Sequence, residues 1–165
     1  MRNRWLRFGL IGVLALVAVL GAGFGLSARA SSASSYKPQT RAFTVTAVPV
    51  LVHEMAGTLP YLQKDFAAGG VLDGKEVYGF YPSTLTVYQG DTINLTLVNP
   101  ADDPHTFTIG APLNVNVDMP GTSTVTAHFT ATQPGIYTFL CAEPEHFPFM
   151  WGQLVVLPDS AAPQS

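Results

Sequence analysis

The 165-residue sequence carries eight basic and eleven acidic side chains, a formal charge of −3, and its length is that of one ordinary domain. From Ser31 onward the balance is four basic against eleven acidic residues, a formal charge of −7. Such a surface argues against nucleic acid and anionic lipid as partners and favours a cationic protein.

Residues 1–30 have the features of an export segment. Three arginines within the first seven residues precede an uncharged run at 8–26, and Ala-Arg-Ala at 28–30 provides a small-x-small cleavage pattern. The run also approaches the roughly 20 apolar residues of a membrane-spanning helix, so a cleaved signal peptide and a retained anchor both stay open. In either case the positive residues stay in the cytoplasm. We therefore expect an extracytoplasmic protein, in the periplasm or on the outer face of the membrane, with a membrane tether if the helix is retained.

The rest of the chain divides by composition. Residues 31–40, rich in Ser and Ala, predict a flexible linker. We expect the folded domain at 41–158 and a disordered tail at 159–165. Within the domain, 54–74 interrupts the strand pattern, and Leu59–Ala68 predicts a short helix ended by Gly69-Gly70.

Short runs with two-residue alternation and many β-branched or aromatic side chains predict strands in the domain. Pro, Gly, Asn and Asp separate the runs, as in an antiparallel sandwich or barrel. Within 92–99, Ile93, Leu95 and Leu97 share one face and polar residues occupy the other. The predicted strands are 43–52, 77–80, 84–88, 92–99, 105–109, 122–131, 135–141 and 152–157.

One cluster of side chains predicts a metal site. Cys141 is the only cysteine of a chain expected where disulfides form, so it needs another role. His146 and Met150 follow within ten residues, and soft sulfur with imidazole is the donor set that selects copper. His105 begins a predicted strand about 40 residues earlier and completes a set of two His, one Cys and one weak Met.

With these residues the sequence resembles the cupredoxin family, through 80–91, 99–107 and 135–141. The likeness covers roughly 77–157, and the Cys-x4-His-x3-Met spacing is that of azurin-like members. The resemblance implies an all-β Greek-key β-sandwich and one type 1 copper ion. It implies His105, Cys141 and His146 as ligands, Met150 as the axial ligand, and outer-sphere electron transfer through the exposed edge of the second histidine.

Two departures from the family pattern bear on the copper ligands. Glu143 stands where many members have Pro, so its backbone N–H is free to donate to the Cys141 sulfur beside that of Thr106. Two donors would stabilise the thiolate and lower the reduction potential. Pro104 before His105 is expected to hold its carbonyl away from the metal, which leaves a four-ligand site.

The function expected from this site is one-electron transfer between redox partners. The alternative is an extracytoplasmic copper carrier or chaperone, and a third reading is a structural sandwich domain with a stray thiol. A dinuclear copper domain needs two cysteines in its ligand loop, and a copper nitrite reductase needs further His ligands, so we expect no enzyme.

The partner is expected to be a redox protein with a basic surface, such as a c-type cytochrome or a terminal oxidase. Four carboxylates, which we call the acidic collar, fall in the two loops that carry the ligands, and Phe147, Pro148 and Phe149 offer an apolar lip for docking. His53 and His128 are expected to be surface histidines. The collar consists of Asp102, Asp103, Glu143 and Glu145.

Overall fold

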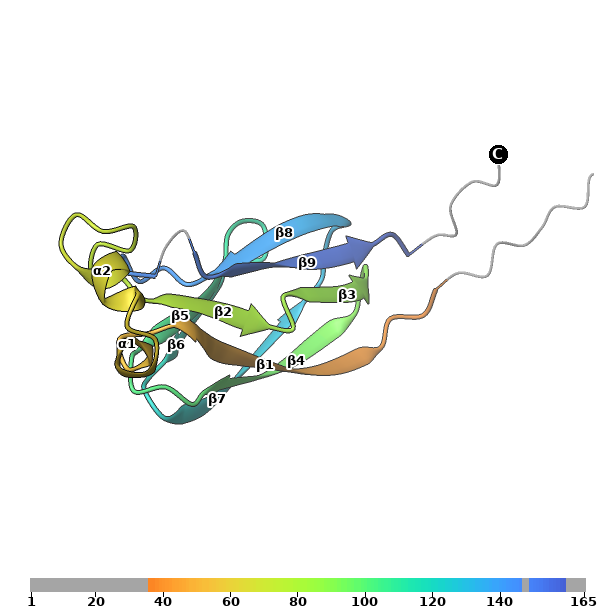
Figure 1. Ribbon diagram of the computed structural model, residues 1–165. Helices are drawn as coiled ribbons and strands as arrows, with labels where there is room; N and C mark the ends of the chain where they lie inside the picture. The colour runs from red at the N-terminus through yellow and green to blue at the C-terminus, as the bar shows by residue number, and fades with distance from the viewer. Residues whose placement is uncertain (1–35, 147–148, 160–165) are drawn as a thin grey trace, which may run out of the picture. The chain divides into compact units, whose positions relative to one another are not determined.

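The computed structural model describes residues 36–146 and 149–159, so the expected export segment, the first half of the linker and most of the tail lie outside the described residues. The described chain forms nine strands and two short helices (Figure 1). In chain order they are β1 (Thr40–Leu51), α1 (Met55–Thr58), α2 (Leu62–Phe66), β2 (Val77–Tyr81), β3 (Thr84–Tyr88), β4 (Thr92–Asn99), β5 (His105–Ile109), β6 (Val115–Met119), β7 (Ser123–Thr130), β8 (Gly135–Leu140) and β9 (Trp151–Leu157).

The strands build two sheets. One has four strands in the order β2-β1-β4-β7, and the other has five in the order β3-β9-β8-β5-β6. Pairing is antiparallel except for β1 with β4 and β3 with β9. The expected β-sandwich is confirmed.

The two-residue alternation of the sequence matches the burial of each strand. Ile93, Leu95 and Leu97 on β4 are fully buried between the sheets, and the residues between them are partly exposed. Phe107 and Phe139 stack at the centre of the core with ring centroids 4.9 Å apart. Burial of these faces is the main force that holds the two sheets together.

Two elements differ from the sequence expectation. Strand β6 was missed, because Asn116 and Asp118 are poor strand formers, although Val115 and Met119 turn inward as a two-residue pattern requires. The single helix predicted at 59–68 is instead the pair α1 and α2, since Pro60 interrupts the segment.

The segment between β1 and β2 is small but has a core of its own. Leu62, Phe66 and Leu72 are buried together. Figure 1 places α1 and α2 at the end of the sandwich where β2 begins. Among residues 36–146 and 149–159, no helix has the length and apolar content needed to cross a bilayer.

A polar cluster centred on Asp91, just before β4, binds the first residues of the described chain to the sandwich. The Asp91 carboxylate is fully buried and accepts hydrogen bonds from Tyr36, Arg41 and two backbone N–H groups. Tyr36 also stacks on Tyr88 at 4.4 Å between ring centroids. Residues 36–40 therefore contact the sandwich, and β1 begins at Thr40.

Candidate copper centre

Strand register brings the predicted ligands to one end of the sandwich. The first residue of β5 is His105, and β5 runs antiparallel to β8, so it lies near the end of β8, where Cys141 follows. β8 in turn runs antiparallel to β9, and the Cys141 N–H donates to the Met150 carbonyl at 3.0 Å. His146 lies in the loop between them. The strands therefore fix two ligands, and the loop supplies a third.

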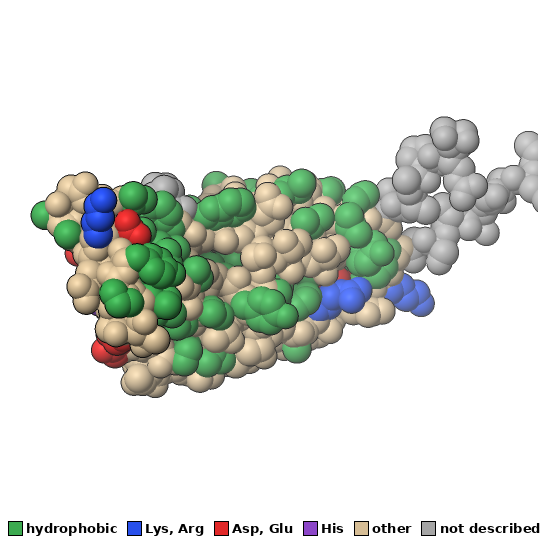
Figure 2. Space-filling view, in the orientation of Figure 1, with side chains coloured by type: hydrophobic (Ala, Val, Ile, Leu, Met, Phe, Trp, Pro, Cys, Tyr) green, Lys and Arg blue, Asp and Glu red, His purple; other side chains and the backbone are tan. Residues whose placement is uncertain are grey.

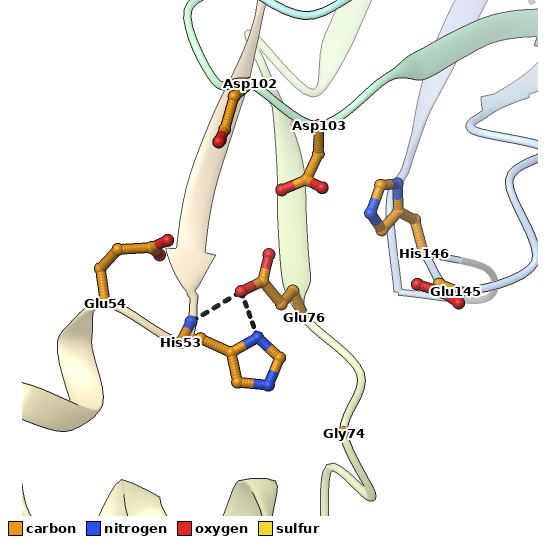
Figure 3. Close-up of a pocket in the computed structure, with 8 residues that line it drawn as sticks. All are labelled: His53, Glu54, Gly74, Glu76, Asp102, Asp103, Glu145 and His146. Carbon is orange, nitrogen blue, oxygen red and sulfur yellow. Dashed lines mark hydrogen bonds and ion pairs between the residues drawn. The ribbon is translucent and has the colours of Figure 1, made fainter.

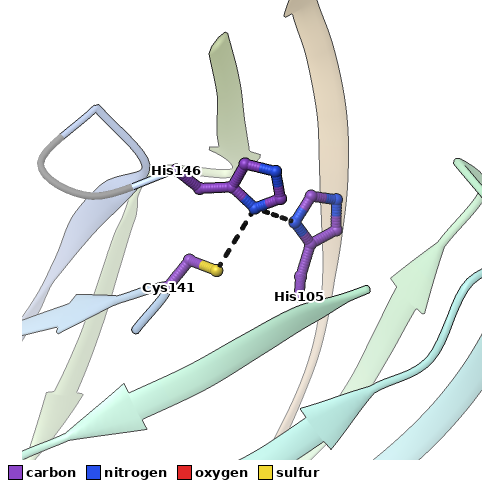
Figure 4. Close-up of side chains that lie close together, drawn as sticks. All are labelled: His105, Cys141 and His146. Carbon is purple, nitrogen blue, oxygen red and sulfur yellow. Dashed lines mark hydrogen bonds between the residues drawn. The ribbon is translucent and has the colours of Figure 1, made fainter. Parts of the chain in front are cut away.

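Three donor atoms face one centre (Figure 4). His105 Nδ1 lies 3.0 Å from His146 Nδ1, and Cys141 Sγ lies 3.7 Å from the same His146 nitrogen. One ligand atom from each of the three residues lies within 4.8 Å of the others. All three side chains are buried, with exposed fractions of 1% for His105, 0% for Cys141 and 6% for His146. The donors therefore converge in the protein interior, away from solvent.

The protonation of His105 suits metal binding. Burial is the main cause of a low pKa for His105, the neighbouring His146 lowers it as well and Asp103 opposes the shift, so that the pKa of His105 is about 4. The imidazole is therefore neutral at physiological pH. A neutral imidazole is the form that binds a metal, so no proton has to leave His105 first.

The sulfur of Cys141 accepts a backbone hydrogen bond, as expected. The Thr106 N–H donates to it at 3.3 Å, and the Thr106 hydroxyl lies 4.0 Å from it. The second donor predicted from the sequence, the Glu143 N–H, makes no bond to the sulfur in the described chain. The Ala142 N–H instead donates to the Thr106 hydroxyl at 2.7 Å, and the Glu143 carbonyl accepts from His146. The structure thus gives the Cys141 sulfur one backbone donor, the Thr106 N–H, in place of the two that the sequence predicts.

Met150 lies in the right neighbourhood for an axial ligand. Its side chain is fully buried, and its N–H donates to the His146 carbonyl at 3.1 Å. Its axial role stays a prediction, as does the four-ligand coordination expected from Pro104.

Tyr78 on β2 is a neighbour of the ligands that the sequence did not point to. Its ring centroid lies 4.5 Å from that of His105 and 4.8 Å from that of His146. Its hydroxyl lies 2.8 Å from Glu76 Oε2 and 2.7 Å from Asp103 Oδ2. No local motif signals this contact, because it arises when β2 and the ligand loops meet across the sandwich.

The acidic collar surrounds His146, together with side chains that precede β2. A pocket of about 260 Å³ is lined by His146 and by three carboxylates of the collar, Asp102, Asp103 and Glu145 (Figure 3). A neighbouring pocket is lined by Asp103, Glu143, Glu145 and His146 among others. All four carboxylates predicted for the collar therefore lie beside this ligand. The larger pocket is also lined by four residues from the segment between β1 and β2, which are His53, Glu54, Gly74 and Glu76.

The two remaining histidines have different surroundings. His128 lies on the exposed face of β7, where its Nδ1 is 2.8 Å from Asn94 Oδ1, as expected for a surface histidine. His53 is half-exposed but not isolated, because its Nδ1 lies 2.6 Å from Glu76 and its tilted ring packs against Phe66 with the ring centroids 4.4 Å apart. It therefore forms part of the pocket wall.

The chemistry of the donor set fits copper. Two neutral imidazoles and one thiolate in a buried, near-trigonal arrangement are the ligands of a blue-copper site, and Met supplies its weak axial contact. His105, Cys141 and His146 would hold the ion, which when bound supplies a Cu(II)/Cu(I) one-electron couple. A β-sandwich that carries such a centre at one end is the architecture of blue-copper proteins.

A family model described as the cupredoxin-like domain matches residues 71–156, more than half of the chain. The chain therefore belongs to the cupredoxin-like domain family. No curated protein sequence matches it significantly.

Solved structures share the fold. A multicopper oxidase called mgLAC is 21% identical, with a TM-score of 0.50, 76% of this chain covered and 41% of that one. A copper nitrite reductase from Nitrosomonas europaea is 22% identical, with a TM-score of 0.51, 72% of this chain covered and 42% of that one. Auracyanin A is a "blue" copper protein from the green thermophilic photosynthetic bacterium Chloroflexus aurantiacus. It is 21% identical, with a TM-score of 0.46, 71% of this chain covered and 98% of that one. The chain thus spans less than half the length of the two enzymes.

Proposed function

We propose that this copper protein carries single electrons between redox partners outside the cytoplasm and catalyses no reaction itself. The observation that carries the proposal is the buried convergence of His105, Cys141 and His146 at one end of a rigid sandwich. Ligands held by strands and a short loop change little between oxidation states, and small rearrangement favours fast electron exchange.

The route for electrons is through His146. Its Nδ1 faces the donor cluster, and in Figure 3 the opposite side of its ring faces the larger acidic pocket. It is the ligand that lines both pockets beside the centre. A partner that docks over these pockets comes within one side chain of the centre.

The partner we propose is a redox protein with a basic surface. The acidic collar and two further glutamates of the larger pocket, Glu54 and Glu76, place negative charge around His146. Phe149 is 47% exposed beside this loop and provides apolar contact area, whereas Phe147 and Pro148 lie outside the described residues. Complementary charge speeds encounter, and apolar contact then holds the complex.

The test begins with the purified domain loaded with Cu(II). We expect an intense visible thiolate-to-copper band that ascorbate bleaches reversibly, absent in Cys141→Ser. His105→Ala should weaken copper binding far more than the matched change His128→Ala. A colourless complex, or colour that survives in Cys141→Ser, would exclude the copper site.

The alternative, a copper carrier, is separated by metal exchange. The burial of all three ligands favours retention, so we expect the protein to exchange electrons with a c-type cytochrome many times before it loses its ion to a chelator. Rapid transfer of copper to an acceptor protein, with slow electron exchange, would favour the carrier. The extracytoplasmic location is tested by fusing a reporter enzyme that is active only outside the cytoplasm after Gln39.

A further inference from the structure

Among the described residues, the second ring nitrogen of His105, Nε2, lacks the hydrogen bond that usually orients a metal-binding histidine. Such a residue normally donates its other ring N–H to a carboxylate, carbonyl or water, and that bond fixes the orientation of the ring. Here His105 Nε2 is buried and has no hydrogen-bond partner in the described chain. Packing must therefore orient this imidazole.

Tyr78 is placed to provide that packing for both histidine ligands. Its ring meets His105 edge to face, with an interplanar angle of 65°, and meets His146 at 60°. Such tilted aromatic pairs attract through the positive edge of one ring and the negative face of the other. Tyr78 is only 2% exposed, so its ring has no room to turn away.

The hydroxyl group of Tyr78 is anchored in turn. It lies within hydrogen-bond distance of Glu76, the residue just before β2, and of Asp103 in the loop before β5. Glu76 is itself held by His53, whose backbone N–H and ring nitrogen both contact its Oε1. The ring is thus fixed at one edge by the two ligands and at the other by carboxylates from two segments.

We propose that Tyr78 is a positioning residue of the copper centre, which holds the His105 and His146 imidazoles in place through its anchored ring. The proposal goes beyond electron transfer and rests only on the copper site. It assigns to β2, which supplies no ligand, a part in setting the geometry of the metal. The segment from His53 to Glu76 acts through the same ring.

The experiment compares Tyr78→Leu with Tyr78→Phe, which keeps the ring. We expect Tyr78→Leu to change the Cu(II) hyperfine splitting in electron paramagnetic resonance and to speed copper loss to a chelator about tenfold, as the loss of two aromatic contacts implies. Tyr78→Phe should stay within about threefold of wild type and keep the hyperfine splitting. Tyr81→Leu, an exposed tyrosine on the same strand, is the matched control and should change neither.

A purely structural role would lower the free energy of unfolding of Tyr78→Leu without altering the spectrum of its folded copper form. A wild-type spectrum with copper loss within twofold of wild type would therefore overturn the proposal. If Tyr78→Leu does not fold, the Cu(I) form of the wild-type protein decides by nuclear magnetic resonance. Nuclear Overhauser contacts from the Tyr78 ring to both histidines are expected, and their absence would overturn the proposal too. A wild-type protein that shows no blue band would contradict the proposed function instead.

Discussion

At the level of single residues, the centre is expected to combine ligands of unequal strength. Cys141, His105 and His146 converge directly, whereas Met150 is held beside them by backbone hydrogen bonds at its own N–H and carbonyl. A weak thioether contact tunes the reduction potential more than it binds the ion. The two roles can be separated by substitution.

We expect Met150→Leu to keep the intense visible band and to raise the reduction potential. Loss of the thioether removes electron donation that favours Cu(II), while the short thiolate bond that produces the colour stays. Protein-film voltammetry with an absorption spectrum measures both. Met55→Leu, in the segment between β1 and β2, is the control and should leave the potential unchanged. A lowered potential, or loss of the band, would show that Met150 has another role.

At the level of elements, the start of β9 must approach β8 very closely. Gly152 is paired with Phe139 in the strand register, and a Cβ atom at Gly152 would collide with the Phe139 ring and the Ser83 carbonyl. Phe139 is the central core residue two positions before Cys141. The glycine therefore lets the strand that follows Met150 lie flat against the strand that precedes the thiolate.

Gly152→Ala should lower the free energy of unfolding of the metal-free protein by about 1–3 kcal/mol, the usual cost of overpacking a core. Gly110→Ala is the control, because no atom lies within 4 Å of a Cβ placed there. It should change the stability by less than about 0.5 kcal/mol. Denaturant titration of both variants measures the difference, and equal stabilities would mean that β9 shifts at no cost.

The start of β1 depends on a charged group in the interior. Burial alone would raise the pKa of Asp91, but its hydrogen bonds from Tyr36, Gln39, Tyr88 and Arg41 outweigh burial and hold the pKa below its ordinary value of 3.8. Because the folded pKa is the lower one, the unfolded chain binds more protons in acid. The stabilisation is therefore complete above the ordinary pKa and is lost as the pH falls through the folded value.

Asp91→Asn should destabilise the metal-free protein at pH 7. It should also flatten the loss of stability between pH 5 and pH 3, because the variant has no carboxylate to protonate at this position. Urea unfolding at these pH values measures the effect. Asp118→Asn, an exposed carboxylate on β6, should leave the pH profile of wild type intact. A profile that Asp91→Asn does not change would assign the acid sensitivity to other groups.

For the whole molecule, charge is distributed unevenly. On the face shown in Figure 2, acidic side chains are visible mainly at the end that carries α1 and α2, beside a basic one, while further basic side chains lie at the opposite end. The two pockets beside His146 are lined by carboxylates and contain no Lys or Arg. The proposed basic partner would be attracted toward the end that holds the ligands.

Electron exchange with a basic c-type cytochrome should slow as salt rises, because the Debye length shrinks from ~10 Å at 0.1 M to ~3 Å at 1 M. The double change Glu143→Gln with Glu145→Gln should flatten this dependence and leave the visible band in place. Asp159→Asn, beyond the far end of β9, should have no effect on the slope. Stopped-flow rates that rise with salt, or an unchanged slope in the double variant, would show that docking occurs elsewhere.

The sequence by itself determined the β-sandwich and the ligand cluster. Inward-facing residues recur every second position, and Cys141, His146 and Met150 lie within ten residues of one another in the sequence. These signals are local, so they survive without knowledge of the fold. The collar was predicted for the same reason, since its four carboxylates flank the ligands in the sequence.

Only the tertiary structure decided what surrounds the ligands. Tyr78, Glu76 and His53 lie around the ligands because β2 begins, and the segment before it ends, beside the ligand loops. Between 27 and 93 residues of chain separate these three residues from His105 and His146. The lack of a second backbone hydrogen bond to the Cys141 sulfur likewise follows from how the loop after β8 folds, because the Glu143 N–H makes no bond to it in the described chain. Contacts between distant segments depend on sheet pairing and on the paths of loops, and neither leaves a periodic trace in the sequence.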